Sequence, residues 1–218
     1  MTRLLIFDFD GLILDTEAPA YESWQHVYEA HGRHLEFATW ATCIGTDDTF
    51  DPHALLEARL GHALDRTEVQ ARRRARFAEL IARQDIRPGV RDYVAEARRL
   101  GLRLAVASSS SRDWVAGHLD RFGLLECFDV LRCAGDVARV KPDPALYRAV
   151  LTALEVGPGE AVAFEDSPNG IRAARAAGIF CVAVPNPLTA DLDLGHADLR
   201  LRSLAELSLP SLLARVAR

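Results

Sequence analysis

The chain has 218 residues, of which 49% are hydrophobic and 26% charged, and its formal net charge is −5 at pH 7. This length fits one large domain or one domain with an insertion, and the negative charge argues against bulk binding of nucleic acid. No apolar run is long enough to span a membrane, and Asp8 and Asp10 interrupt the stretch where a signal peptide would be apolar. We therefore expect a cytoplasmic protein with no membrane or nucleic-acid partner, acting as a monomer or weak dimer.

The first predicted element is a strand at residues 4–7, because four consecutive apolar residues are typical of a strand buried on both faces. Asp8 and Asp10 follow it, and strand alternation would point both side chains to the same side. Two carboxylates this close favour a nearby cation such as Mg²⁺, and Gly11 allows a sharp turn. Taken alone, the pattern fits an acidic strand end in water equally well.

Residues 17–85 are predicted to contain helices and no strand, with an irregular stretch at 33–64. Thr16 can cap a helix that starts at Glu17, Asp51-Pro52 starts another helix, and Thr67-Glu68 can cap a long helix that runs to about Gln84. The last helix carries an arginine run at 72–76. This run fits a solvated helix face, and the alternative is that one arginine contacts an anionic substrate.

From Pro88-Gly89 onward, helices alternate with short apolar strands. Strands are predicted at 102–107, 128–133, 161–164 and 180–184. Helices are predicted at 91–100, from Arg112, from Pro144, at 171–177, and between 203 and 216 with a break near Pro210. We assign Trp114 to the apolar face of its helix. The alternation predicts the α/β class, with a Rossmann-like, doubly wound parallel sheet.

Polar residues follow the predicted strands at the carboxyl edge of this sheet, where open α/β sheets bind ligands. They are Asp8, Asp10, Ser108, Ser109, Glu165 and Asp166, with Lys141, the only lysine in the chain, in a loop that can reach the same edge. Each has a structural interpretation of its own, such as a helix cap for Ser108 or a solvated charge for Lys141. Their convergence on one edge favours a site.

These residue types together suit phosphoryl transfer. Asp8, Glu165 and Asp166 can hold a hard cation through oxygen. Ser108 and the N–H groups after it lie at a predicted helix N-terminus, where phosphate oxygens bind well, and Lys141 adds a positive charge. One carboxylate can act as a nucleophile and form an acyl phosphate, and another can transfer protons.

The motifs Asp8-Phe9-Asp10-Gly11, Ser108, Lys141-Pro142 and Glu165-Asp166-Ser167 with Asn169-Gly170 resemble the four ordered motifs of the haloacid dehalogenase (HAD) superfamily. The helical insertion is similar to the small cap of the subfamily that contains β-phosphoglucomutase and many sugar-phosphate phosphatases. The resemblance implies a core domain at 1–16 and 86–218 and a cap domain at 17–85.

The resemblance also implies roles for individual residues. Asp8 would be the nucleophile and Asp10 the general acid and base, with residues 11–16 as a flap. Mg²⁺ would be bound by Asp8, the backbone carbonyl of Asp10 and Asp166, with Glu165 assisting. Ser108, Ser109 and Lys141 would hold the phosphoryl group. Candidates for substrate contact are Thr16, Asp47, Asp48, Arg72 and Arg76.

Within this superfamily, dehalogenases lack the second aspartate, which is present here as Asp10. Phosphonate hydrolases use a cap lysine, and 17–85 contains no lysine. Mutases resembling β-phosphoglucomutase carry a histidine where this chain has Ala20, and an arginine near 45–48 that this chain lacks. We therefore expect a Mg²⁺-dependent phosphatase that acts on a small phosphorylated metabolite through an aspartyl phosphate. The alternatives are a phosphosugar mutase and a non-enzymatic phosphoacceptor module.

Overall fold

The computed structural model describes residues 1–41 and 50–216. The chain divides into two compact units, which we name the core unit (Met1–Leu14 with Ile86–Arg218) and the helical unit (Asp15–Asp85).

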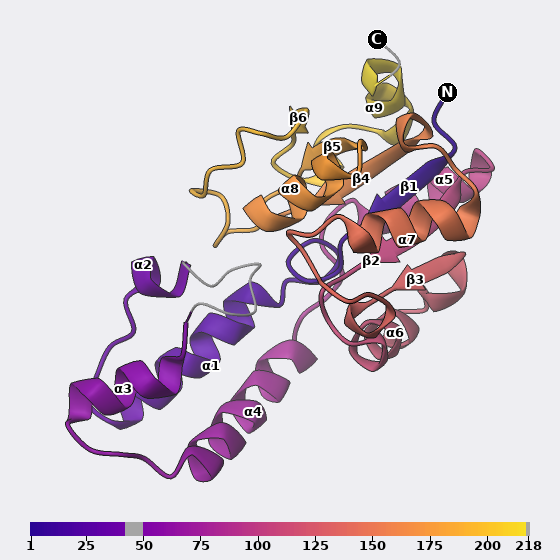
Figure 1. The fold of residues 1–218 in the computed structure, drawn as a ribbon. Coiled ribbons are helices and arrows are strands. Elements are labelled where there is room, and N and C mark those ends of the chain that lie inside the picture. The colour runs from indigo at the N-terminus through magenta and orange to yellow at the C-terminus, as the bar shows by residue number, and fades with distance from the viewer. Residues whose placement is uncertain (42–49, 217–218) are drawn as a thin grey trace. The chain divides into compact units, whose positions relative to one another are not determined.

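The core unit contains a six-stranded parallel sheet in the order β3-β2-β1-β4-β5-β6 (Figure 1). The strands are β1 (Leu4–Phe7), β2 (Arg103–Ala107), β3 (Val130–Arg132), β4 (Ala161–Glu165), β5 (Phe180–Ala183) and β6 (Leu199–Arg200). In the register, Phe7 of central β1 lies between Val106 of β2 and Phe164 of β4. These three strands therefore end at one level, and the predicted doubly wound parallel sheet is confirmed. The two-residue strand β6 is too short to give a sequence signal.

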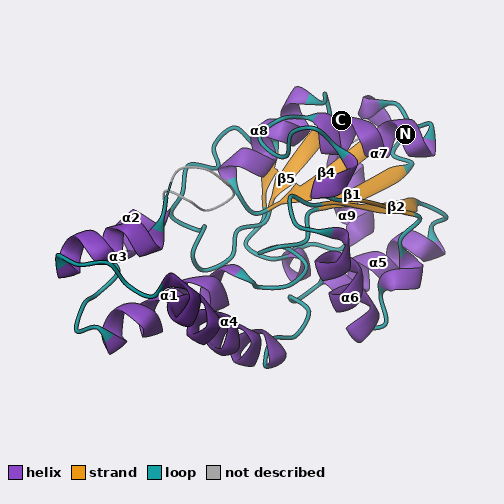
Figure 2. Ribbon diagram, turned by 60° about the horizontal axis from the view of Figure 1, so that its bottom comes forward, coloured by secondary structure: helices purple, strands orange, loops and turns teal. Residues whose placement is uncertain are grey.

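Helices cover both faces of this sheet (Figure 2). They are α5 (Val90–Arg99), α6 (Arg112–Arg121), α7 (Ala145–Leu154), α8 (Pro168–Ala176) and α9 (Leu209–Val216), with short 3-10 turns at Leu125–Cys127, Ala134–Asp136, Pro158–Glu160 and Leu204–Glu206. Leu4 and Ile6 of β1 pack in one buried apolar cluster with residues of α7 and α8. On the other face, Phe164 contacts both Phe7 and Tyr93 of α5. Successive side chains of a buried strand therefore point to opposite faces of the sheet, and each set packs against the helices on its own face.

One predicted helix boundary in the core unit is wrong, and a proline explains it. Helix α8 begins at Pro168 rather than Ile171, because the Ser167 hydroxyl caps it by accepting from the Gly170 N–H at 3.2 Å. The predicted break near Pro210 is present at residues 207–208, which separate the 3-10 turn Leu204–Glu206 from α9, and Pro210 itself lies in the first turn of α9. Proline is tolerated in a first turn because its missing N–H would have had no partner there.

The helical unit consists of α1 (Glu17–Ala30), α2 (Phe37–Trp40), α3 (Pro52–Leu60) and α4 (Arg66–Ala82), and it contains no strand within 15–41 and 50–85. Helix α1 packs against α4. The cap of α4 is Asp65 rather than Thr67: Asp65 Oδ1 accepts from the backbone N–H groups of Thr67 and Glu68.

Residues 11–14 and 86–87 connect the sheet to the helical unit and belong to the core unit. Leu14 forms an isolated antiparallel bridge with Ile86. The Arg87 guanidinium donates to the carbonyl oxygens of Gly11, Val184 (3.2 Å) and Pro185 (2.7 Å). The turn after β1 is thereby tied to the segment after β5. Across the described residues, no helix has both the length and the apolar character to cross a membrane.

Candidate active site

Asp8 directly follows β1 and forms a buried ion pair with Lys141, which comes from the loop before α7. Lys141 Nζ lies 2.6 Å from Asp8 Oδ1 and 2.6 Å from Glu165 Oε1 at the end of β4. The Tyr147 hydroxyl of α7 also donates to Glu165 Oε1. The Lys141 side chain is only 5% exposed. One ammonium group therefore holds two buried carboxylates in fixed positions.

The burial of this cluster changes how its groups titrate. Burial raises the pKa of the Asp8 carboxyl far above its ordinary value, Lys141 opposes that rise, and the negative charges of Glu165 and Asp10 add to it. Burial alone would lower the pKa of Lys141, but the attraction of Asp8 and Glu165 outweighs it and the pKa is raised. Lys141 is therefore firmly cationic, and the acidic groups of Asp8, Glu165 and Asp166 outnumber this one ammonium group.

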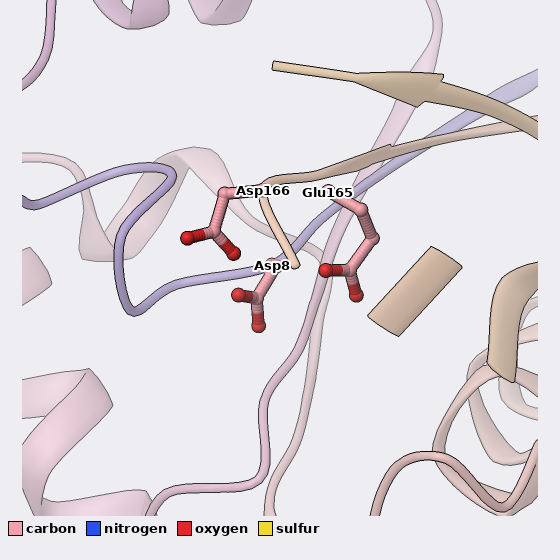
Figure 3. Close-up of side chains that lie close together, drawn as sticks. All are labelled: Asp8, Glu165 and Asp166. Atoms are coloured by element: carbon pink, nitrogen blue, oxygen red, sulfur yellow. The ribbon is translucent and has the colours of Figure 1, made fainter. Parts of the chain in front are cut away.

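Asp8, Glu165 and Asp166 each offer a carboxylate oxygen within 4.8 Å of the other two (Figure 3). Glu165 Oε2 is buried without a hydrogen-bond partner among the residues that the structure describes. An unsatisfied buried oxygen and an excess of acidic groups both favour a bound cation. Three oxygen donors suit a hard divalent ion, so this set fits a divalent metal site.

Two glycines leave room for these carboxylates. Gly11 has φ +77°, and a Cβ there would lie 2.1 Å from Asp166 Oδ2. A Cβ on Gly170 would lie 1.8 Å from Glu165 Oε2. Gly11 is needed for its left-handed backbone and for this close approach, whereas Gly170 is needed for the approach alone.

The predicted phosphate-binding residues follow β2. Ser108 is fully buried, and its Oγ accepts from the Ser110 N–H at 3.0 Å. The Ser109 hydroxyl oxygen is buried without a hydrogen-bond partner in the described part of the chain. A buried hydroxyl without a partner is available to a ligand oxygen. Both serines precede the N-terminus of α6, capped by Ser111.

Asp10 has surroundings different from those of Asp8. Strand β1 ends at Phe7, so strand alternation does not determine where the Asp10 side chain points. Its Oδ2 accepts from the Ser110 hydroxyl at 2.6 Å and lies 3.3 Å from Ser108 Oγ, while its Oδ1 accepts from Trp114 Nε1 at 2.9 Å. Asp10 is half-buried and is bound by neutral donors.

Assigning Trp114 to the apolar face of α6 alone misses this contact. Val115 and Leu119 are fully buried, whereas Trp114 is half-buried and its indole N–H binds a carboxylate. Tryptophan has an apolar ring and a polar N–H group. Helical periodicity therefore does not reveal whether burial of the ring or a hydrogen bond from the N–H determines its position.

Asn186 is a further site residue that the sequence pattern did not reveal. It lies in the segment after β5, and its Nδ2 donates to Asp166 Oδ2 at 2.7 Å. Its Oδ1 accepts from the N–H groups of Leu188 and Thr189, which fixes the amide orientation. The sequence signal that could have identified Asn186 is its position after a strand of the same parallel sheet.

The predicted substrate-contact residues lie in the helical unit or outside the described residues. Thr16 is buried at the start of α1, but its side chain makes no capping hydrogen bond; Asp15 Oδ1 accepts from the Ala18 N–H instead. On α4, Arg72 pairs with Glu68 at 2.6 Å and Arg76 with Glu79 at 3.1 Å. Asp47 and Asp48 lie outside the described residues.

Comparisons with known proteins agree with this architecture. A family model described as haloacid dehalogenase-like hydrolase matches residues 2–178. The protein YhcW of Bacillus subtilis (strain 168) is 46% identical over 213 residues, 98% of this chain and 97% of YhcW. A phosphorylated carbohydrates phosphatase of Thermotoga maritima is 32% identical over 178 residues, 80% of this chain and 81% of that protein. The solved structure of a CbbY variant from Rhodobacter sphaeroides in complex with xylulose-1,5-bisphosphate has a TM-score of 0.75 at 32% identity, covering 97% of this chain and 99% of that one.

Proposed function

The chain belongs to the haloacid dehalogenase-like hydrolase family and is a phosphatase, and on that premise we propose that it hydrolyses a small phosphorylated metabolite, a sugar phosphate or a similar compound, with Mg²⁺ and through an aspartyl phosphate. The observation that carries the proposal is the buried Asp8 carboxylate, held by Lys141 beside two further carboxylates. The relatives that bind or hydrolyse phosphorylated carbohydrates support the substrate class. We place the activity in the cytoplasm.

In the proposal, Asp8, Asp166 and the backbone carbonyl of Asp10 would hold Mg²⁺, and Glu165 would orient the set. When bound, the metal supplies positive charge that neutralises the phosphoryl oxygens. Lys141 contributes a second positive charge beside Asp8. Ser108 and Ser109 bind phosphoryl oxygens through their hydroxyl groups and the N–H groups before α6.

The chemistry proceeds in two displacements. An Asp8 carboxylate oxygen attacks phosphorus, the bond from phosphorus to the substrate oxygen breaks, and Asp10 gives a proton to that leaving oxygen. Water then attacks phosphorus, Asp10 takes a proton from the water, and the bond between phosphorus and Asp8 breaks. Inorganic phosphate and the original carboxylate result.

The helical unit is proposed to be the cap, which selects the substrate, with Thr16, Arg72 and Arg76 as candidate contacts. A cap can vary while the core keeps its chemistry, because function depends on sites carried by a fold. Hydrolysis is favoured over phosphosugar mutase chemistry by the relative that is a phosphatase and by Ala20 in place of the mutase histidine.

The test is phosphate release from p-nitrophenyl phosphate and from a panel of sugar phosphates, with Mg²⁺ and with EDTA. We expect Mg²⁺-dependent turnover by the wild type and none by Asp8→Asn. Asp129→Asn is the matched control, because Asp129 pairs with Arg103 elsewhere in the core unit and should leave turnover intact. Acid-quenched wild type should carry a phosphoryl group that hydroxylamine removes. Turnover by Asp8→Asn would overturn the proposal.

A further inference from the structure

We propose that Trp114 is a positioning residue that fixes the acid–base carboxylate of Asp10 from within the core unit. The inference rests on the proposed function, since it assigns a role to Trp114 only if Asp10 transfers protons. The contact that carries it is the hydrogen bond from Trp114 Nε1 to Asp10 Oδ1, at 2.9 Å.

The three donors around Asp10 differ in how firmly they constrain it. Ser110 and Ser108 lie near one oxygen, Oδ2, and a hydroxyl rotates freely about its C–O bond and can donate or accept. Within residues 1–41 and 50–216, the hydrogen bond to the other oxygen, Oδ1, comes from Trp114, whose N–H can only donate and points along the plane of a rigid ring. The indole therefore determines the orientation of the carboxylate, and the serines adapt to it.

Trp114 is itself held at both its backbone and its ring. Its backbone N–H donates to the Ser111 hydroxyl at 3.3 Å, which places Trp114 in the capped first turn of α6. Its ring meets the His118 ring edge to face, with centroids 4.1 Å apart. His118 in turn stacks with Phe9, the residue between Asp8 and Asp10, at 6.2 Å. The ring that orients Asp10 is thus braced against the segment that carries Asp10.

This arrangement makes a specific kinetic prediction. A positioned acid accelerates departure of a poor leaving group, which needs a proton, more than departure of a good one, which does not. Loss of the indole N–H should therefore leave reactions with good leaving groups nearly unchanged and slow those with poor leaving groups. A residue with a merely structural role would affect all substrates equally.

The experiment measures kcat/KM for p-nitrophenyl, phenyl and p-methoxyphenyl phosphate, three esters of similar size whose leaving groups become progressively poorer. We expect Trp114→Phe to stay within about threefold of wild type on p-nitrophenyl phosphate and to lose on the order of tenfold on p-methoxyphenyl phosphate. Asp10→Asn should show the same trend with a larger loss. Trp114→Gln, which restores an N–H donor, should recover part of the difference.

The matched control is Tyr93→Phe, which removes a buried ring donor that binds the Leu207 carbonyl at 2.6 Å in the same unit. It should not change the relative rates of the three esters. Equal losses by Trp114→Phe on all three, or no loss on any, would overturn the inference. If Trp114→Phe does not fold, Trp114→Leu, which also removes the indole N–H, is judged by the same criterion. Failure of the wild type to hydrolyse any ester would overturn the proposed function instead.

Discussion

Two ion pairs, one in the core unit and one in the helical unit, lie in opposite environments. In the core unit, the Lys141 side chain is 5% exposed and lies between Asp8 and Glu165. In the helical unit, Arg72 is 66% exposed and pairs with Glu68 on the same face of α4. The first ion pair is buried away from water, whereas water surrounds the second pair and weakens its attraction.

The two environments determine which charged side chains can be removed without unfolding the chain. Removing one partner of a buried pair leaves an uncompensated charge, which is strongly destabilising. An exposed pair contributes little and can be replaced freely. The chemistry of the core unit is therefore tied to its stability, whereas the exposed pair of Arg72 and Glu68 in the helical unit can be lost without unfolding the chain.

The largest expected effect comes from Lys141→Met. Two buried carboxylates would then face each other without the ammonium, and the chain should lose about 3–5 kcal/mol of unfolding free energy together with its phosphatase activity. Urea unfolding and p-nitrophenyl phosphate turnover measure both losses. Arg72→Met is the matched control for the unfolding free energy, since it removes a cation from an exposed pair. Equal unfolding free energies for the two variants would contradict the difference between the buried and the exposed ion pair.

Asn186→Ala should weaken metal binding without abolishing the fold. Asp166 would lose the donor that orients its Oδ2, and loss of such a partner costs roughly 10–100-fold in metal affinity. Mn²⁺ titration followed by electron paramagnetic resonance measures this directly, independent of activity. Asn169→Ala is not a suitable control because it lies next to the site. Thr152→Ala, on an exposed position of α7, should leave Mn²⁺ affinity unchanged.

The ion pair of Glu57 and Arg66 in the helical unit should stabilise the fold in a pH-dependent way. A hydrogen bond from Arg66 lowers the pKa of Glu57 from 4.5 to about 2. Because the folded-state pKa lies below the unfolded-state value, this pair stabilises the fold fully above pH 4.5 and loses its effect as the pH falls toward 2. The difference in urea midpoint between wild type and Arg66→Gln should therefore shrink across this range. A difference that stays constant down to pH 2 would contradict the assignment.

The smallest expected effect is that of Arg72→Ala on stability. Exposed pairs four residues apart on a helix contribute about 0.3–0.5 kcal/mol, so thermal unfolding should shift by only about 1–2 °C. The informative quantity is KM for the best sugar phosphate. A raised KM at unchanged stability would assign Arg72 to the substrate, and an unchanged KM would remove it from the candidates.

The parallel sheet can be predicted from the sequence, and so can the convergence of Asp8, Lys141 and Glu165. Parallel strands end at the same edge of a sheet whatever their order, so polar residues at that edge lie close together. That argument needs no knowledge of side-chain contacts. It says nothing about Trp114, whose helical periodicity resembles that of a core residue, or about Gly170, whose small size matters only once the Glu165 side chain is placed.

Local hydrogen bonding accounts for the smaller errors. Asp65 and Thr67 are both good cap residues, and only the backbone conformation decides between them. The role of Asn186 depends on a turn with Thr189 and on a partner 20 positions away. Such contacts join segments that share no periodic pattern, so a single sequence does not reveal them.

The bridge between Leu14 and Ile86 has a consequence for how this architecture diversifies. The segment between these residues leaves the core unit and returns at the same place, so it is topologically a closed loop. The entropic cost of closing a loop rises slowly with length, by about 0.6 kcal/mol for each doubling. Insertions, deletions or the exchange of the whole segment would therefore leave β1 and β2 in register, and new specificities can be grafted onto an unchanged catalytic scaffold.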